Sequence, residues 1–212
     1  TPPKTQAALL EAMEERQVTI EGQARPLPEP FIVVATQNPV EYEGTYPLPE
    51  AQLDRFMLEL RVSYPTRTEE EAIVEQTTGS RQVTLKPVLN AAELHAMQDL
   101  VRRVPVSKSL IASAVALARM TRPADPEAPP FIREFVEWGA GPRASQYLVL
   151  GAKAKAAMAG RPMADLDDVK AVAPSVLRHR VVTNFAAEAA NRSNDDLMRE
   201  LLASSGWQLR RA

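Results

Sequence analysis

Residues 31–35 read Phe-Ile-Val-Val-Ala, an unbroken apolar run that is rich in β-branched side chains. Such a run is typical of a strand buried on both faces, as in a parallel sheet covered by helices. Residues 57–62 alternate between apolar and polar side chains and predict a second strand. A helix over residues 4–15 and a hairpin over residues 17–27, with its turn at 21–23, precede these strands. The chain therefore opens with a predicted α/β region.

Beyond Tyr64-Pro65 the sequence predicts almost only helices. Thr66 with Glu69 and Asn90 with Glu93 have the spacing of capping boxes at helix starts. A third helix, capped by Ser107, is expected over 107–118 with one apolar face: Leu110, Ile111, Ala114, Val115 and Ala118. Further helices are expected over 131–138 and 142–159, from the cap Asp165 with a kink or break at Pro174, and from Asn194 to Gly206. The fold class is thus α/β followed by all-α, and we place the two domains at residues 1–65 and 66–212.

Composition narrows the functional classes. The 212 residues carry a net charge of −2, which excludes a globally basic nucleic-acid binder. The absence of cysteine excludes disulfides, thiolate metal sites and thiol catalysis. No apolar run is long enough to span a membrane, and no signal-peptide pattern opens the chain. The chain begins at Thr1 without an initiator Met, so we expect a portion of a longer protein.

The first candidate site is the polar cluster Thr36-Gln37-Asn38-Pro39, which directly follows the first predicted strand. Ligands of open α/β sheets gather beyond the carboxyl ends of the strands. Asn38 is therefore well placed to contact a ligand or to orient a water molecule. The alternative is a plain polar loop that Pro39 ends.

Two arginines are the other candidates. Arg143 follows Pro142, so it falls in the first turn of a helix, where a cation opposes the helix dipole unless an anion such as phosphate lies nearby. Arg55 precedes the second predicted strand and could reach a phosphate on an adjacent subunit. The alternatives are ion pairs: Arg143 with some carboxylate, and Arg55 with Asp54 or Glu50.

Other charged groups have structural interpretations. His95 and His179 lack companion ligands, so a zinc site is not expected. The run Arg178-His179-Arg180 is interpreted as a solvated face. The segment 139–144 matches G-x-G-x-x-A, but the residues before it predict a helix and not the strand that a dinucleotide fingerprint requires. The sequence G-x-x-x-x-G-K-[ST], the phosphate loop, does not occur.

Together these motifs resemble the MoxR family of AAA+ ATPases. The resemblance is carried by PPKTQAALLEAMEE at residues 2–15, ATQNP at 35–39, EGTYPLPEAQLDRF at 43–56, GPRA at 141–144 and VLRHR at 176–180. The long run that ends at Phe56 is the most specific of these. The family's phosphate loop and acidic metal-binding motif (Walker A and Walker B) are missing, so the resemblance is to the C-terminal portion of such an ATPase.

The resemblance implies a role for each candidate residue. Asn38 corresponds to sensor 1, which positions the attacking water, and residues 31–35 to its strand. Arg55 corresponds to the arginine finger and Arg143 to sensor 2. Residues 17–27 correspond to the pre-sensor-1 hairpin, and residues 66–212 to the helical lid domain.

The resemblance also implies an activity and partners. The intact protein is expected to bind and hydrolyse ATP with Mg²⁺ in a cytoplasmic homo-oligomer, a hexameric ring, and to remodel client proteins as a chaperone, with von Willebrand factor A-type partner proteins. This chain alone is expected to be inactive. Two alternatives remain: a non-catalytic binding or assembly module, or a nucleic-acid motor of the related hairpin clade, which the negative charge disfavours.

Overall fold

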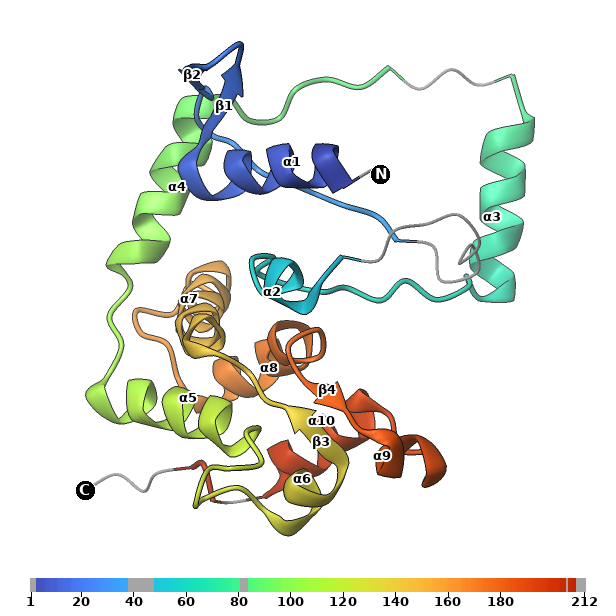
Figure 1. Ribbon diagram of the computed structural model, residues 1–212. Coiled ribbons are helices and arrows are strands. Elements are labelled where there is room, and N and C mark those ends of the chain that lie inside the picture. Colours follow the sequence, from blue (N-terminus) through green and yellow to red (C-terminus); the bar gives the residue numbers. More distant parts are fainter. Residues whose placement is uncertain (1–2, 38–47, 81–83, 205, 209–212) are drawn as a thin grey trace.

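The amino-terminal part of the fold is a helix followed by a hairpin. The computed structural model describes residues 3–37, 48–80, 84–204 and 206–208. Helix α1 (Pro3–Glu15) leads into strands β1 (Gln17–Ile20) and β2 (Gln23–Pro26), which pair antiparallel with Gln17 opposite Pro26 (Figure 1). Both turn residues between the strands have positive φ, 51° and 78°, as a two-residue type I′ turn requires. The predicted helix and hairpin are thereby confirmed.

The two strands predicted from residues 31–35 and 57–62 are not formed. Both segments are extended, but neither is part of a sheet in the described structure, whose strands make only two antiparallel pairs. Val34 and Val62 are 86% and 96% exposed. A strand exists only when a neighbouring strand pairs with its backbone, and no described segment pairs with these two. The prediction that these two segments are strands of a sheet is therefore wrong for the described structure.

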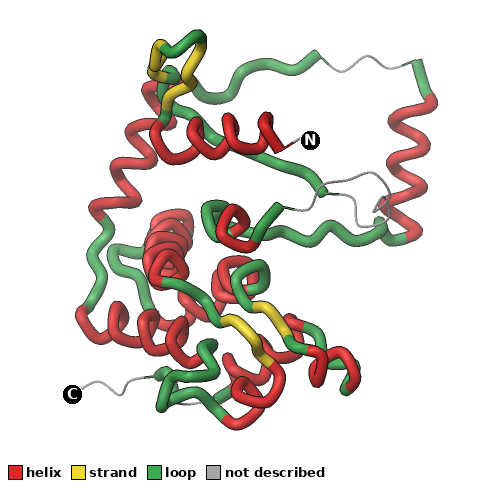
Figure 2. Tube along the Cα trace, in the orientation of Figure 1, coloured by secondary structure: helices red, strands yellow, loops and turns green. Residues whose placement is uncertain are grey.

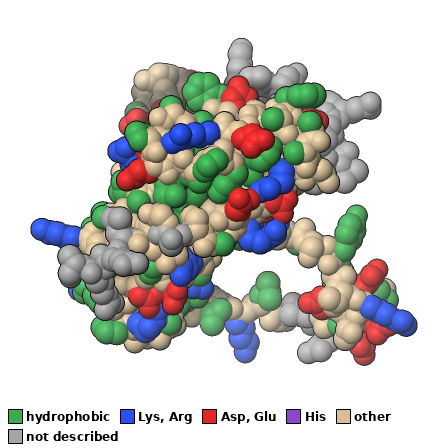
Figure 3. All heavy atoms as spheres, turned by 90° about the horizontal axis from the view of Figure 1, so that it is seen from below, with side chains coloured by type: hydrophobic (Ala, Val, Ile, Leu, Met, Phe, Trp, Pro, Cys, Tyr) green, Lys and Arg blue, Asp and Glu red, His purple; other side chains and the backbone are tan. Residues whose placement is uncertain are grey.

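One helix lies between these two segments in the sequence, and another follows the second segment. The short helix α2 (Glu50–Leu53) lies between α1 and the helical domain (Figure 1). Helix α3 (Arg67–Thr78) begins at the predicted capping box, in which Thr66 and Glu69 satisfy each other's backbone N–H groups. It buries no residue and stands apart from the rest of the molecule (Figure 3).

The rest of the chain is mainly helical. Its elements are α4 (Ala91–Arg103), α5 (Lys108–Met120), α6 (Pro130–Phe135), β3 (Val136–Trp138), α7 (Pro142–Met158), α8 (Leu166–Leu177), β4 (Val182–Thr183), α9 (Phe185–Ala189) and α10 (Asn194–Ala203). Figure 2 shows the short β3–β4 ribbon among these helices. Asn90, Ser107 and Asp165 cap α4, α5 and α8 as predicted.

The core of this helical domain surrounds α7. Helix α7 packs against α4, α5 and α8. The fully buried side chains include Leu117, Ile132, Leu148, Val169, Leu177, Leu197, Leu201 and Trp207. Burying each such side chain contributes roughly 1.5–3 kcal/mol of hydrophobic free energy, so the helical domain holds most of the folding energy of the described chain.

Four local predictions need correction. The helix expected over residues 131–138 ends at Phe135, because Val136 and Trp138 pair with β4 instead. On α5 the predicted apolar face is buried at Leu110, Ala114 and Ala118. Ile111 and Val115 of that face are exposed, and Leu117 is buried in addition. The last helix ends at Ala203, before Gly206. The remaining correction concerns the proline in α8.

Helix α8 runs through Pro174 without the predicted break. An interior proline costs a helix about 3 kcal/mol, because it removes one hydrogen bond and crowds the preceding turn. Here Val169, Ala173 and Val176, on both sides of Pro174, are completely buried. The burial of these side chains outweighs the cost of the proline.

Candidate functional site

Arg143 enters the site from the start of α7. Pro142 is the first residue of this helix, and Gly141 precedes it in an extended conformation without a side-chain cap. The approach to the helix is fixed from α5, because Thr121 Oγ1 accepts a hydrogen bond from the Ala140 N–H at 2.8 Å. The guanidinium of Arg143 is therefore held at the amino end of α7, 41% exposed, where the helix dipole favours an anion as its neighbour.

Arg55 enters the same site from the turn after α2. Backbone hydrogen bonds from Arg55 N to Gln52 O (3.2 Å) and from Phe56 N to Leu53 O (3.1 Å) close this turn. The Arg55 side chain is 26% exposed. Its Nε lies buried and has no hydrogen-bond acceptor within the described part of the chain. Buried N–H groups normally have a hydrogen-bond acceptor, so the Arg55 Nε–H can bind an oxygen of a ligand that enters the site.

The two guanidinium groups meet at one carboxylate. Arg143 Nη2 lies 2.9 Å from Oε1 of Glu14, near the end of α1, and Arg55 Nη1 forms an ion pair with the same oxygen. Arg143 Nη1 also lies 3.5 Å from Oδ2 of Asp54. Asp54 Oδ1 in turn accepts a hydrogen bond from Arg180 Nε at 2.9 Å. Residues from α1, the α2 turn, α7 and the end of α8 thus form one cluster.

The cluster has the chemistry of an anion site. Three guanidinium groups face two carboxylates, which leaves one positive charge in excess. Arginine presents rigid N–H pairs that match the oxygens of a phosphate. Partly exposed ion pairs such as Arg143–Glu14 contribute only about 0–1 kcal/mol each, so a phosphate of higher charge can replace the Glu14 carboxylate at little cost.

The structure tests the sequence-predicted candidates unequally. It brings Arg55 and Arg143 together, although they are 88 positions apart in the sequence. The expected alternative for Arg143, an ion pair with a carboxylate, is present, whereas Arg55 pairs with Glu14 and with neither Asp54 nor Glu50. Asn38 lies outside the described residues.

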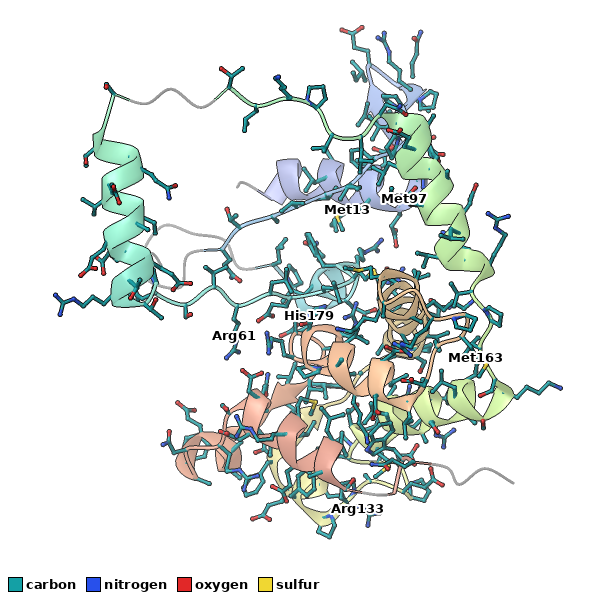
Figure 4. All side chains as sticks on the ribbon, turned by 180° about the vertical axis from the view of Figure 1, so that it is seen from behind. Met13, Arg61, Met97, Arg133, Met163 and His179 are labelled. Atoms are coloured by element: carbon teal, nitrogen blue, oxygen red, sulfur yellow. The ribbon has the colours of Figure 1, made fainter. Side chains whose placement is uncertain are left out.

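Sequence reasoning missed the part played by residues 178–180. This run was interpreted as a solvated face, but the Arg180 side chain is 1% exposed and its guanidinium lies 5.1 Å from the centre of the Tyr147 ring. Figure 4 labels the neighbouring His179, which lies where the end of α8 meets the segment after α2. Burial and the adjacent Arg180 lower the pKa of His179 to about 4. Its imidazole is therefore neutral at pH 7, and its Nε2–H donates to Phe56 O at 3.1 Å.

Among the residues that the structure describes, no group of three His, Cys, Asp or Glu side chains could hold a metal ion. In the same residues no helix combines the length and apolar character needed to cross a membrane.

Comparisons with protein families match both parts of the chain. The profile of the "ATPase family associated with various cellular activities (AAA)" matches residues 1–58, which include Glu14 and Arg55. The profile of the "AAA lid domain" matches residues 131–201, which include Arg143 and Arg180. The candidate site thus lies between a segment of an AAA ATPase core and its lid.

Individual relatives point to one branch of these ATPases. The chain is 38% identical over 95% of its length to "Chaperone MoxR1" of Mycobacterium tuberculosis and spans 53% of that protein. It is 39% identical over 96% of its length to the uncharacterized protein YeaC of Bacillus subtilis and spans 61% of it. The crystal structure of a candidate ATPase from Cytophaga hutchinsonii superimposes with a TM-score of 0.89 at 35% identity, covering 95% of this chain and 61% of that one.

The chain therefore spans a little more than half the length of the relatives that it matches. The fold class predicted from the sequence, the C-terminal part of an AAA+ core followed by a helical lid, agrees with both profiles and with the structural match. The chain belongs to the MoxR family of AAA+ ATPases.

Proposed function

We propose that Arg55 and Arg143 together bind the terminal phosphate of ATP in an ATP-hydrolysing member of this family. The observation that carries the proposal is the convergence of both guanidinium groups on one oxygen of Glu14. In this proposal the carboxylate occupies the place that a phosphate oxygen takes when nucleotide is bound. The free Arg55 Nε supplies an additional donor for it.

Phosphate binding by two arginines suits the chemistry of phosphoryl transfer. The transferred group carries its charge on three oxygens, and catalysis consists mainly of positioning and charge neutralisation. An arginine that stabilises this charge contributes about 10³–10⁵ in rate once the nucleotide and Mg²⁺ are held. In the proposal Asn38 orients the attacking water. The phosphate loop, which this sequence lacks, and the residues that hold Mg²⁺ would come from the rest of the ATPase.

The proposal extends to assembly. If Arg55 is an arginine finger, it acts on a nucleotide of the adjacent subunit, and Arg143, which shares its carboxylate, reaches the same nucleotide. Such a head-to-tail contact is heterologous and closes into a ring when the rotation permits. We propose that the intact protein forms a homo-oligomeric, hexameric ring in the cytoplasm. We further propose that the ring remodels client proteins together with von Willebrand factor A-type partners. The name of the Mycobacterium tuberculosis relative, a chaperone, supports the remodelling role. Residues 1–65 serve as the core segment and residues 66–212 as the lid.

The experiment is ATP turnover by the ATPase that carries these residues together with a phosphate loop. Arg55→Ala and Arg143→Ala should each lower kcat by at least about a hundredfold. Arg133→Ala is the matched control, because among the described residues Arg133 donates hydrogen bonds to the nearby backbone carbonyls of Asp125 and Pro126 and to no residue of the site. Unchanged kcat in both site variants would refute the proposal.

A second candidate function is a non-catalytic assembly module. It is favoured by the exposed apolar side chains of the two extended segments, such as Val34 and Val62, and by the missing phosphate loop. Turnover of the intact ATPase, taken together with calorimetry of the 212-residue chain and MgATP, separates the two roles, because an assembly module predicts a normal kcat in Arg55→Ala. We expect no measurable binding to the isolated chain, and a turnover effect of Arg55→Ala only where the phosphate loop is present.

A further inference from the structure

The segment that carries Arg55 is held by side chains of the helical domain. Residues 54–59 begin with the turn after α2, at Asp54 and Arg55, and form no sheet with any described strand. Their backbone carbonyls would lack partners at such a junction, and buried carbonyls require donors. The donors come from α7 and from the end of α8, more than 80 positions later in the sequence.

Arg180 supplies most of these donors. Its Nη2 donates to Asp54 O at 2.8 Å and to Phe56 O at 2.5 Å, and its Nη1 donates to Met57 O at 3.3 Å. Its Nε donates to the Asp54 carboxylate at 2.9 Å. The guanidinium fork can bind several acceptors at once because its five N–H groups have a fixed planar geometry. A lysine ammonium has only three donors on one atom and cannot reproduce this pattern.

Neighbouring side chains complete the attachment. Arg178 Nη1 donates to Glu59 O at 3.3 Å, His179 Nε2 donates to Phe56 O, and the Tyr147 hydroxyl donates to Arg55 O at 3.3 Å. The Glu59 N–H donates to Ser175 O at 2.8 Å. The carbonyls at positions 54, 55, 56, 57 and 59 are therefore all held by the helical domain.

This attachment fixes Arg55 relative to Arg143. Tyr147 lies one helical turn after Arg143 on α7, so the same helix presents one guanidinium of the site and holds the backbone of the other. Arg180 stacks on the Tyr147 ring and binds the carbonyls on both sides of Arg55. The two arginines of the site therefore stand on one rigid unit.

We propose that Arg180 is a positioning residue for catalysis: it fixes the backbone of residues 54–57 on the helical domain, so that Arg55 and Arg143 are presented to the phosphate as a pair. This inference rests on the proposed function. A buried ion pair contributes little net stability compared with apolar packing, so the stability of the lid does not explain a guanidinium at this position. The need to hold Arg55 in place does explain the guanidinium of Arg180, since an error of about 1 Å in the position of a catalytic group can lower the rate about a hundredfold.

The test is a double-mutant cycle in the intact ATPase, with kcat and KM for ATP as readouts. Arg180→Lys keeps the charge but loses the fork, and it should lower kcat about tenfold to a hundredfold, with KM changed less than about twofold. In the Arg55→Ala background the same substitution should lower kcat by less than about twofold, because Arg180 acts through Arg55. A purely structural role would multiply the two effects.

Arg192→Lys is the matched control. Arg192 also stacks on an aromatic ring, Phe135 at 5.5 Å, and also pairs with a carboxylate, Glu200, but it has no hydrogen bond or ion pair with residues 54–59. The kcat of Arg192→Lys should equal that of the unmodified protein. If Arg180→Lys does not fold, Tyr147→Phe takes its place: it removes only the hydroxyl bonded to Arg55 O and leaves the ring under Arg180. It should lower kcat about twofold to tenfold, again without further effect in the Arg55→Ala background.

The outcomes separate the two proposals. A normal kcat in folded Arg180→Lys, or an equal loss with and without Arg55, overturns the positioning role and leaves the proposed function intact. An Arg55→Ala variant with normal kcat overturns the proposed function itself, whatever Arg180→Lys does.

Discussion

Gly139 lies where the chain leaving β3 passes the end of α5, directly before the Ala140-Gly141-Pro142 approach to Arg143. A Cβ at Gly139 would lie 2.4 Å from Thr121 O and 2.6 Å from Arg122 Cα. Both contacts are with backbone, which cannot rotate away as a flexible side chain does. Gly139→Ala is therefore predicted to push the two segments apart.

The structure sets the magnitude. Ordinary contact requires the segments to separate by about 1 Å, given the 2.4 Å approach. That movement strains two hydrogen bonds of 2.8 Å, from Ala140 N to Thr121 Oγ1 and from Arg122 Nε to Ala140 O. Overpacking costs about 1–3 kcal/mol, and a buried group that loses its partner adds about 1–3 kcal/mol. We expect a loss of about 2–6 kcal/mol in the free energy of unfolding, or about 4–24 °C in Tm.

Urea unfolding followed by tryptophan fluorescence measures this change, because both tryptophans lie in the helical domain and Trp207 is fully buried. Gly141→Ala is the matched control: a Cβ there meets nothing within 4 Å, so the change should stay within about 0.5 kcal/mol. Equal midpoints for the two variants would refute the close approach of β3 and α5 on which the placement of Arg143 depends.

Two further predictions concern the core and the attachment of residues 54–59. Leu148 is fully buried at the centre of α7, so Leu148→Ala should lower the free energy of unfolding by about 2–5 kcal/mol in the same urea titration. Met158 lies exposed at the end of the same helix, so the control Met158→Ala should change this free energy by less than about 0.5 kcal/mol. The pKa of His179 is lowered from 6.5 to about 4 in the folded state, by burial first and then by Arg180. Between pH 6.5 and 4 the unfolded chain therefore binds one more proton at His179 than the folded chain does. The free energy of unfolding should fall as pH drops through this range, by at most about 1.4 kcal/mol per pH unit. His179→Gln should remove this part of the pH dependence, and a pH profile identical to that of the unmodified protein would contradict the lowered pKa.

Local signals in the sequence were enough for the helices of the lid. The capping boxes at Thr66, Asn90 and Asp165 require only residues three positions apart, and each begins a helix in the structure. Pro174 shows the opposite case. Its cost to α8 is local, but the burial of Val169 and Val176 that offsets it depends on packing against other helices, which no short window of sequence reveals.

The site could be predicted only in part for the same reason. Arg55 and Arg143 stood out because an arginine before an apolar segment and an arginine in a first helical turn are locally unusual. Glu14, which joins them, lies in a helix where an acidic residue is ordinary. Arg180 sits in a basic run that matches a solvated surface, and only its contacts with a segment more than 120 positions earlier show that it is buried.

A crystal structure of the intact ATPase with Mg²⁺ and a non-hydrolysable ATP analogue would show directly whether Arg55 and Arg143 bind one phosphate together. We expect the guanidinium groups of Arg55 and Arg143 to leave Glu14 and both to contact the terminal phosphate of one nucleotide. The proposed phosphate site would be refuted if both arginines stayed on Glu14 with the nucleotide bound, or if only one of them came within hydrogen-bonding distance of any phosphate oxygen.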